Sequence, residues 1–285
     1  MPTLETHNGY PLWLYIPNRP AAVIFTIIFV IITGYHTYLL FRRRLWFVIP
    51  FVVGGYFEVI GYLGRILAYD KTGELIPYLL QSIFLLLAPV LFAATLYMTL
   101  SRVILAVDGA SCSIIRPRWL TAIFVTGDVV SFFIQGGGAG LLTQAKSQDD
   151  SKRGEYIIVG GLIFQILIFG VFCATALVFN MRFRRHHHSE TYRHKPWQSV
   201  LVMLYVTSLL IMARNVFRVV EYAMGHQGYL LSNEWPVYVF DGTLMFFTMA
   251  FFALRYPSQL YGGKRVEANI ELASGSSAST QRHIV

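Results

Sequence analysis

The sequence RNVFRVVEYAMGHQGYLLSNE, residues 214–234, follows directly from an apolar segment that begins at Trp197. Within it, Arg214, Arg218 and Glu221 succeed one another at spacings of four and three residues. In a helix of about 3.6 residues per turn, these three side chains lie on one face. Because charged side chains are costly in the hydrocarbon interior of a membrane, we expect this face to point toward protein or water.

The composition indicates an integral membrane protein. Of the 285 residues, 55% are hydrophobic and 13% are charged, whereas soluble proteins carry roughly 25% charged residues. The net charge of +8 is explained by basic loops, so we expect no nucleic-acid partner. Two cysteines, Cys112 in a predicted loop and Cys173 in a predicted span, do not indicate a disulfide framework.

Seven apolar segments are long enough to cross a bilayer, which takes about 20 helical residues. We place these spans at 21–41, 46–69, 75–107, 119–142, 156–181, 197–224 and 235–255. The sequence thus predicts an all-α bundle of seven transmembrane helices at 20–257, between an extracellular arm at 1–19 and a disordered cytosolic tail at 258–285. The third span is long enough to require tilt or a cytosolic extension, and Pro89 is a candidate kink.

Basic residues predict the orientation of the bundle. The loops with the basic excess contain Arg42 to Arg44, Arg116, Arg118, Arg182 to Lys195, Lys264 and Arg265. By the positive-inside rule, the N-terminus is then outside and the C-terminus cytosolic. The loop Arg182–Lys195 is also expected to contact anionic lipid. We expect the protein in the plasma membrane.

Further polar residues interrupt the apolar spans. Glu58 and Arg65 are seven residues apart in the second span, as are Asp128 and Gln135 in the fourth, and Asp241 lies in the seventh. A spacing of seven places two side chains on one helix face. From the predicted directions of the spans, the outward half of the membrane contains Arg65, Gln135, Arg214, Arg218, Glu221 and Asp241. Glu58 and Asp128 lie nearer the middle.

These polar residues permit two interpretations. They could pair between helices and only stabilise the bundle, at about 0.6–2 kcal/mol per contact. Alternatively they line a functional cavity, which we favour because seven charges over four spans exceed what helix packing needs. The glycines at 136–138 and 140 allow either close packing or local unwinding. Residues 146–155 are expected to form a loop.

The sequence does not indicate enzyme or metal chemistry. His186 to His188 lie in a basic loop, and no HxxxH or HExxH pair falls in a span. Neither a GxSxG nucleophile motif nor a phosphate-binding P-loop is present. We therefore expect no enzyme activity, catalytic residue, metal site or cofactor.

Long stretches resemble the fungal lipid-translocating exporters, also called RTA-like (resistance to aminocholesterol) proteins. The matching stretches are EVIGYLGR at 58–65, LLLAPVLFAATLYM at 85–98, PRWLTAIFVTGDVVSFFIQGGGAG at 117–140, GLIFQILIFGVF at 161–172 and RNVFRVVEYAMGHQGYLLSNEWPVYVFDG at 214–242. The resemblance spans nearly all of 20–257. It implies a seven-span protein that exports or flips sphingoid long-chain bases, confers resistance to sterol-like toxic compounds or, in one branch, moves porphyrins. It transfers no catalytic residue, and the family's recurrent polar positions correspond to Glu58, Arg65, Asp128, Gln135, Arg214, Arg218, Glu221 and Asp241.

The resemblance therefore implies transport of a small amphipathic lipid as the function, with membrane lipids as the other partners. In that reading, Glu221 or Asp241 holds the amine of a sphingoid base, while Arg214 and Arg218 balance the empty site or meet a phosphate. The alternative is a seven-span receptor or sensor that regulates the response to lipid or toxin. A rhodopsin-like receptor is disfavoured, because the third span lacks an acidic-arginine pair and the seventh lacks NPxxY.

Overall fold

The computed structural model describes Trp13 and residues 15–70, 72–143, 148–186, 197–224 and 228–258. Within these ranges the regular structure is helical, without strands. The long helices are α1 (Arg19–Arg43), α2 (Ile49–Ala68), α3 (Leu75–Ala106), α4 (Pro117–Thr143), α5 (Gln148–His186) and α6 (Trp197–Ala223). The π-helix η4 (Val237–Thr243) continues directly into α8 (Leu244–Leu254). Short helices are η1 (Trp46–Val48), η2 (Gly109–Cys112) and α7 (Tyr229–Ser232).

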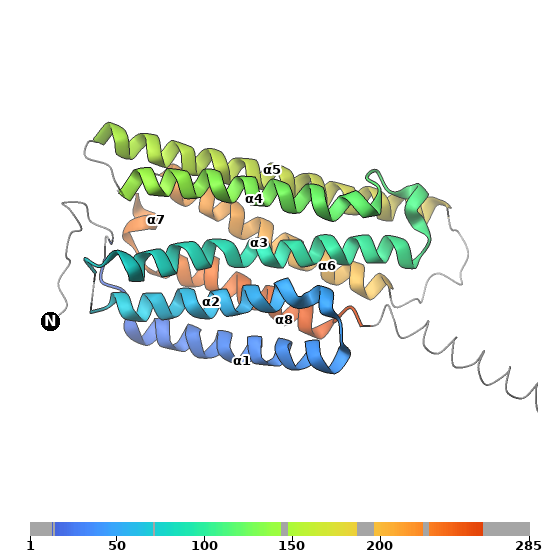
Figure 1. The fold of residues 1–285 in the computed structure, drawn as a ribbon, viewed down its shortest axis with the longest axis horizontal. Coiled ribbons are helices and arrows are strands. Elements are labelled where there is room, and N and C mark those ends of the chain that lie inside the picture. Colours follow the sequence, from blue (N-terminus) through green and yellow to red (C-terminus); the bar gives the residue numbers. More distant parts are fainter. Residues whose placement is uncertain are drawn as a thin grey trace, which may run out of the picture.

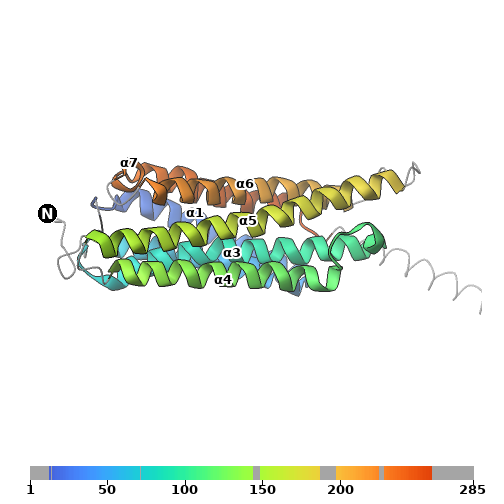
Figure 2. The same ribbon diagram turned by 90° about the horizontal axis from the view of Figure 1, so that it is seen from above.

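Seven of these helical segments are long and apolar enough to cross a membrane, which confirms the predicted fold class. They lie side by side along one common axis in both perpendicular views (Figures 1 and 2). Contacts close a ring in the order α1, α2, α3, α4, α5, α6 and α8, and α8 returns to α1. Helices α3 and α6 also meet across the middle of this ring. The faces on which α3 and α6 meet are therefore shielded from lipid by the neighbouring helices.

The burial pattern fits a bundle surrounded by lipid. Large apolar side chains project from the outer helices, with Ile31 of α1, Phe133 of α4 and Leu167 of α5 exposed by 60% or more (67%, 70% and 62%). Aromatic rings fill the interior, where Phe51 stacks on Phe252 with ring centroids 4.1 Å apart and also packs against Phe92. Such a wide apolar exterior is expected where hydrocarbon replaces water.

Both ends of α1 follow local capping rules, and the helix boundaries differ from the predicted ones by a few residues. Helix α1 begins at Arg19, inside the predicted arm, because the Asn18 side chain accepts a hydrogen bond from the Ala21 amide at 3.2 Å and Pro20 occupies the first turn. The α1 helix ends at Arg43, and the residue that follows, Arg44, has a left-handed backbone with φ of 53°. The residues described do not test the predicted arm before Trp13, nor the tail beyond Ser258.

Two expectations about α4 and α5 need correction. Helix α5 already begins at Gln148, so residues 148–155 are helical rather than part of a loop. Helix α4 runs unbroken through its glycines, so local unwinding is wrong and close packing is correct at Gly138. A Cβ atom added to Gly138 would lie 2.9 Å from the Gly154 carbonyl oxygen of α5. The small residue therefore lets the two backbones approach closely.

Candidate functional site

The central polar feature is a buried network of four charged side chains on α6 and η4, here called the ion-pair network. Asp241 accepts hydrogen bonds from Arg214 Nε and, at 3.0 Å, from Arg218 Nη2. Arg218 Nη1 also donates to Glu221 Oε2 at 2.9 Å. Arg214, Glu221 and Asp241 are at most 2% exposed. The network therefore joins two cations and two anions without net charge, in surroundings where an unpaired charge would be costly.

The spacing of residues on α6 explains three members of the network. Arg214, Arg218 and Glu221 share one face of the last turns of α6, as predicted, and this face points toward the seventh span. Asp241 and Glu221 share one arginine, because the guanidinium of Arg218 contacts both carboxylates. The planar fork of arginine suits such bridging.

A proline on α3 supplies a further partner for the network. Pro89 lies inside α3, and a helical proline cannot donate to the carbonyl four residues earlier. That carbonyl belongs to Leu85, and it accepts a hydrogen bond from Arg214 Nη2 at 2.7 Å. Pro89 was expected only as a kink. Its freed carbonyl instead ties Arg214 to the central helix α3.

The backbone around Asp241 is a π-helix of seven residues, Val237–Thr243. Thr243 follows this wider geometry, since its hydroxyl donates to the Tyr238 carbonyl five residues earlier at 2.9 Å. Next to Asp241, a Cβ atom added to Gly242 would lie 2.7 Å from the Phe25 ring of α1. π-helical segments are rare and occur often at functional sites. This segment presents Asp241 to α6 while Gly242 packs tightly against α1.

Glu58 lies beside the ion-pair network without joining it by hydrogen bonds. Its side chain on α2 is fully buried, and neither carboxylate oxygen has a partner among the residues described. The charges of Asp241, Arg214 and Arg218 all act on it. Glu58 is thus a buried carboxyl group that neither arginine of the network pairs with.

Arg65 forms a second cluster near the same end of the bundle. Its guanidinium donates to Glu234 at 2.9 and 3.1 Å, to the Tyr238 hydroxyl at 3.0 Å and to Gln81 at 3.1 Å. It also donates to the Tyr15 hydroxyl at 2.7 Å. These contacts join α2 and α3 to the start of the seventh span and to the segment before α1.

Two members of the Arg65 cluster were not predicted as site residues. Glu234 precedes the seventh span, and Tyr238 follows it by four residues. This spacing of one helical turn could have indicated that the two side chains lie on the same face. Both Oε atoms of Glu234 also accept a hydrogen bond from the backbone N–H of Asn18, each at 2.8 Å. The cluster therefore anchors the N-terminal segment to the bundle.

The polar residues of α4 lie apart from both clusters. Asp128 accepts a hydrogen bond from the Tyr97 hydroxyl of α3 at 2.7 Å. Gln135 donates to Ser131 at 2.7 Å and to Gln165 of α5 at 3.0 Å. The eight predicted residues therefore do not form one hydrogen-bonded group. Arg214, Arg218, Glu221 and Asp241 do so, and Glu58 adjoins them.

The arrangement can bind charged groups by exchange of ion-pair partners. Arg218 is the most accessible member, with its side chain 13% exposed, and its buried Nε has no hydrogen-bond partner within the described part of the chain. An ammonium group could replace a guanidinium at Asp241, and a phosphate could replace a carboxylate at Arg218.

Among the described residues, no group of three or more His, Cys, Asp or Glu side chains is placed to hold a metal ion.

A bundle of seven spans with buried ion pairs between its helices defines a multi-pass integral membrane protein. A family model described as RTA1 like protein matches residues 51–264, and the chain belongs to this family. This confirms the resemblance seen in the sequence.

Several relatives come from Saccharomyces cerevisiae. The chain is 31% identical to protoporphyrin uptake protein 1, over 87% of this chain and 93% of that protein. It is 30% identical to protein RTA1, over 88% and 86% of the two chains. Identity with the sphingoid long-chain base transporter RSB1 of strain JAY291 is 25%, over 87% and 74%. No solved structure matches the chain significantly.

Proposed function

We propose that this protein transports an amphipathic lipid-like compound, a sphingoid long-chain base in particular, across or between the leaflets of a fungal plasma membrane. One observation carries the proposal, namely the placement of Asp241 between two arginines in a π-helical segment inside an apolar bundle. The relative named as a sphingoid long-chain base transporter supports the substrate class. The relative named for protoporphyrin uptake provides a second amphiphile for comparison.

The ion-pair network explains how a charged amine could enter an apolar bundle. The ammonium group of the base takes the place of Arg218 at Asp241, and Arg218 keeps its contact with Glu221. Neither Asp241 nor Glu221 is then left without a cation, which limits the cost of the exchange. The hydrocarbon tail remains among the apolar side chains or the surrounding lipid. Movement without an ATP-binding unit is passive or coupled to an ion.

The proposal places the network in the outer half of the membrane. The last turns of α6, the short helix α7 and the start of α1 gather at one end of the bundle (Figure 1). The opposite end carries Arg42, Arg43 and Arg44, which the positive-inside rule assigns to the cytosol. The substrate therefore reaches Asp241 from the outer leaflet side.

This orientation predicts the protease sensitivity of terminal tags. In intact cells, a tag before Met1 should be removed by external protease, while a tag after Val285 should remain intact until the membrane is permeabilised. The opposite result would place the ion-pair network on the cytosolic side and refute the access route.

Reconstituted protein provides the test of transport. Purified protein in liposomes should accelerate the movement of a fluorescent sphingoid base between leaflets, relative to liposomes that contain no protein. Labelled protoporphyrin serves as an amphiphile of opposite charge, and the base is expected to move faster. Saturable binding of the base without any acceleration would instead favour the receptor or sensor interpretation.

A further inference from the structure

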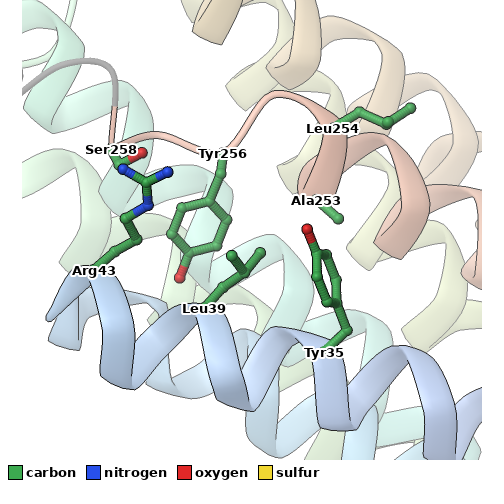
Figure 3. A pocket seen from close by; sticks show the side chains of 7 residues that line it. All are labelled: Tyr35, Leu39, Arg43, Ala253, Leu254, Tyr256 and Ser258. Carbon is green, nitrogen blue, oxygen red and sulfur yellow. The ribbon is translucent and has the colours of Figure 1, made fainter.

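A cavity lies at the end of the bundle that carries the basic residues, away from the ion-pair network. It is an open pocket bounded by the last turns of α1 and by the residues at the end of α8 (Figure 3). Its lining consists of Tyr35, Leu39, Arg43, Ala253, Leu254, Tyr256 and Ser258. The volume is about 320 Å³, and small-molecule sites commonly span roughly 300–1,000 Å³.

The lining of the cavity offers hydrogen-bond donors and one positive charge. Arg43 contributes a guanidinium group, and Tyr35, Tyr256 and Ser258 contribute hydroxyl groups. The Arg43 side chain lies next to Ser258, and the Tyr256 ring stands between them and Leu39 (Figure 3). None of the described residues that line it is a carboxylate. Such a set favours an anion with several acceptor oxygens.

Tyr256 is the strongest sign of a ligand. The residue is 6% exposed, and its hydroxyl is buried without a hydrogen-bond partner in the ranges that the structure covers. Burial raises the pKa of this hydroxyl to about 12, although the nearby Arg43 opposes the shift. The hydroxyl therefore keeps its proton at neutral pH. A buried donor without an acceptor is unfavourable, and an anionic ligand would satisfy it.

The surroundings indicate that the ligand comes from the membrane. Leu254 beside the cavity is 76% exposed and Tyr35 is 50% exposed, so both face the lipid surface of the bundle. The cavity lies where α1 and α8 end, at the level expected for headgroups. The neighbouring Arg42, Arg44 and Arg255 add positive charge, which disfavours a headgroup that carries its own cation.

We infer that this cavity binds the phosphate of an anionic phospholipid, with Arg43, Tyr256 and Ser258 as its donors. The lipid tails then lie along the apolar surface beside Leu254. This site is separate from the ion-pair network and does not depend on the proposed transport function.

Thermal unfolding of the purified full chain in detergent tests the inference. Short-chain phosphatidic acid should raise the unfolding temperature in a saturable way, whereas short-chain phosphatidylcholine and inorganic phosphate should not. Arg43→Gln removes the charged donor and should weaken the apparent affinity for phosphatidic acid by about tenfold or more. Tyr256→Phe should also weaken it, without lowering the stability of the lipid-free protein, because the lost hydroxyl had no partner.

Arg42→Gln is the matched control. It removes one positive charge from the adjacent residue, whose guanidinium donates to Tyr38 rather than lining the cavity. Affinity for phosphatidic acid should be retained within about twofold, since the lost charge is exposed and screened. Equal losses in the Arg42 and Arg43 variants would show diffuse attraction and overturn the site. Equal stabilisation by inorganic phosphate would overturn the lipid as its ligand.

Discussion

Asp241→Asn is expected to destabilise the protein by about 3–5 kcal/mol, the usual cost of breaking a buried ion pair. The carboxylate of Asp241 is the anion that Arg214 contacts, and it shares Arg218 with Glu221. Its neutralisation leaves Arg214, which is 2% exposed, with neutral acceptors in place of its anion, namely the asparagine amide oxygen and the Leu85 carbonyl. Reversible unfolding in mixed micelles by increasing SDS measures this change in the free energy of unfolding.

Asp128→Asn is the matched control for the loss of a buried carboxylate. Asp128 is 1% exposed, like Asp241, but its partner in the structure is the neutral hydroxyl of Tyr97. An asparagine still accepts that hydrogen bond, so the expected loss is about 1 kcal/mol or less. Similar losses in the two variants would mean that the arginines around Asp241 contribute nothing specific.

Arg65→Gln is expected to have the second large effect, a loss of about 3 kcal/mol or more. Arg65 is fully buried, and its guanidinium bonds to Glu234, Tyr238, Gln81 and Tyr15. Glutamine can replace only a fraction of these contacts and leaves the Glu234 carboxylate without its cation. The same SDS unfolding series measures the loss. Limited proteolysis should also cut the segment before α1 faster in the variant.

Arg19→Gln is the control, because it removes an exposed arginine whose salt bridge is to Asp70. Arg19 and Asp70 are 3.6 Å apart, and their side chains are 53% and 64% exposed. An exposed pair of this kind contributes roughly 0–1 kcal/mol. If Arg19→Gln proved as damaging as Arg65→Gln, the Arg65 cluster would not be the anchor of the N-terminal segment.

The apolar runs of the sequence were sufficient to predict the seven spans, because burial in hydrocarbon demands long helices of continuous apolar character. The boundary at Gln148 was missed because residues 148–155 are polar, and hydropathy does not reveal a helix that extends beyond the membrane. The spacing of Arg214, Arg218 and Glu221 correctly predicted their shared face, since this depends only on helical geometry within one segment.

Contacts between spans were harder to predict. Glu58 and Arg65 share a face of α2, yet Arg65 pairs with Glu234, while Glu58 lies near Asp241. Which carboxylate meets which arginine depends on the rotation and tilt of each helix, and these are set by packing across the bundle. The π-helix at Asp241 had no sequence signal. The Leu85 carbonyl could have been identified, because Pro89 always leaves the carbonyl four residues earlier without its helical donor.

The paired substitution of Arg214→Gln and Asp241→Asn separates a structural role of the ion-pair network from a role in binding. It removes one cation and its anion together, and it leaves the Arg218–Glu221 pair at 2.9 Å in place. The double variant should therefore recover most of the stability that Asp241→Asn alone loses. Once the double variant is as stable as the native protein, a difference between their transport rates can be assigned to binding rather than to misfolding.

Transport of a fluorescent sphingoid base by liposomes that contain equal amounts of native protein or this double variant tests the central claim most directly. If Asp241 holds the amine, the folded double variant should transport the base about tenfold or more slowly, as expected for the loss of a charged hydrogen bond. A well-folded double variant that transports the base at the native rate would show that the network only stabilises the bundle.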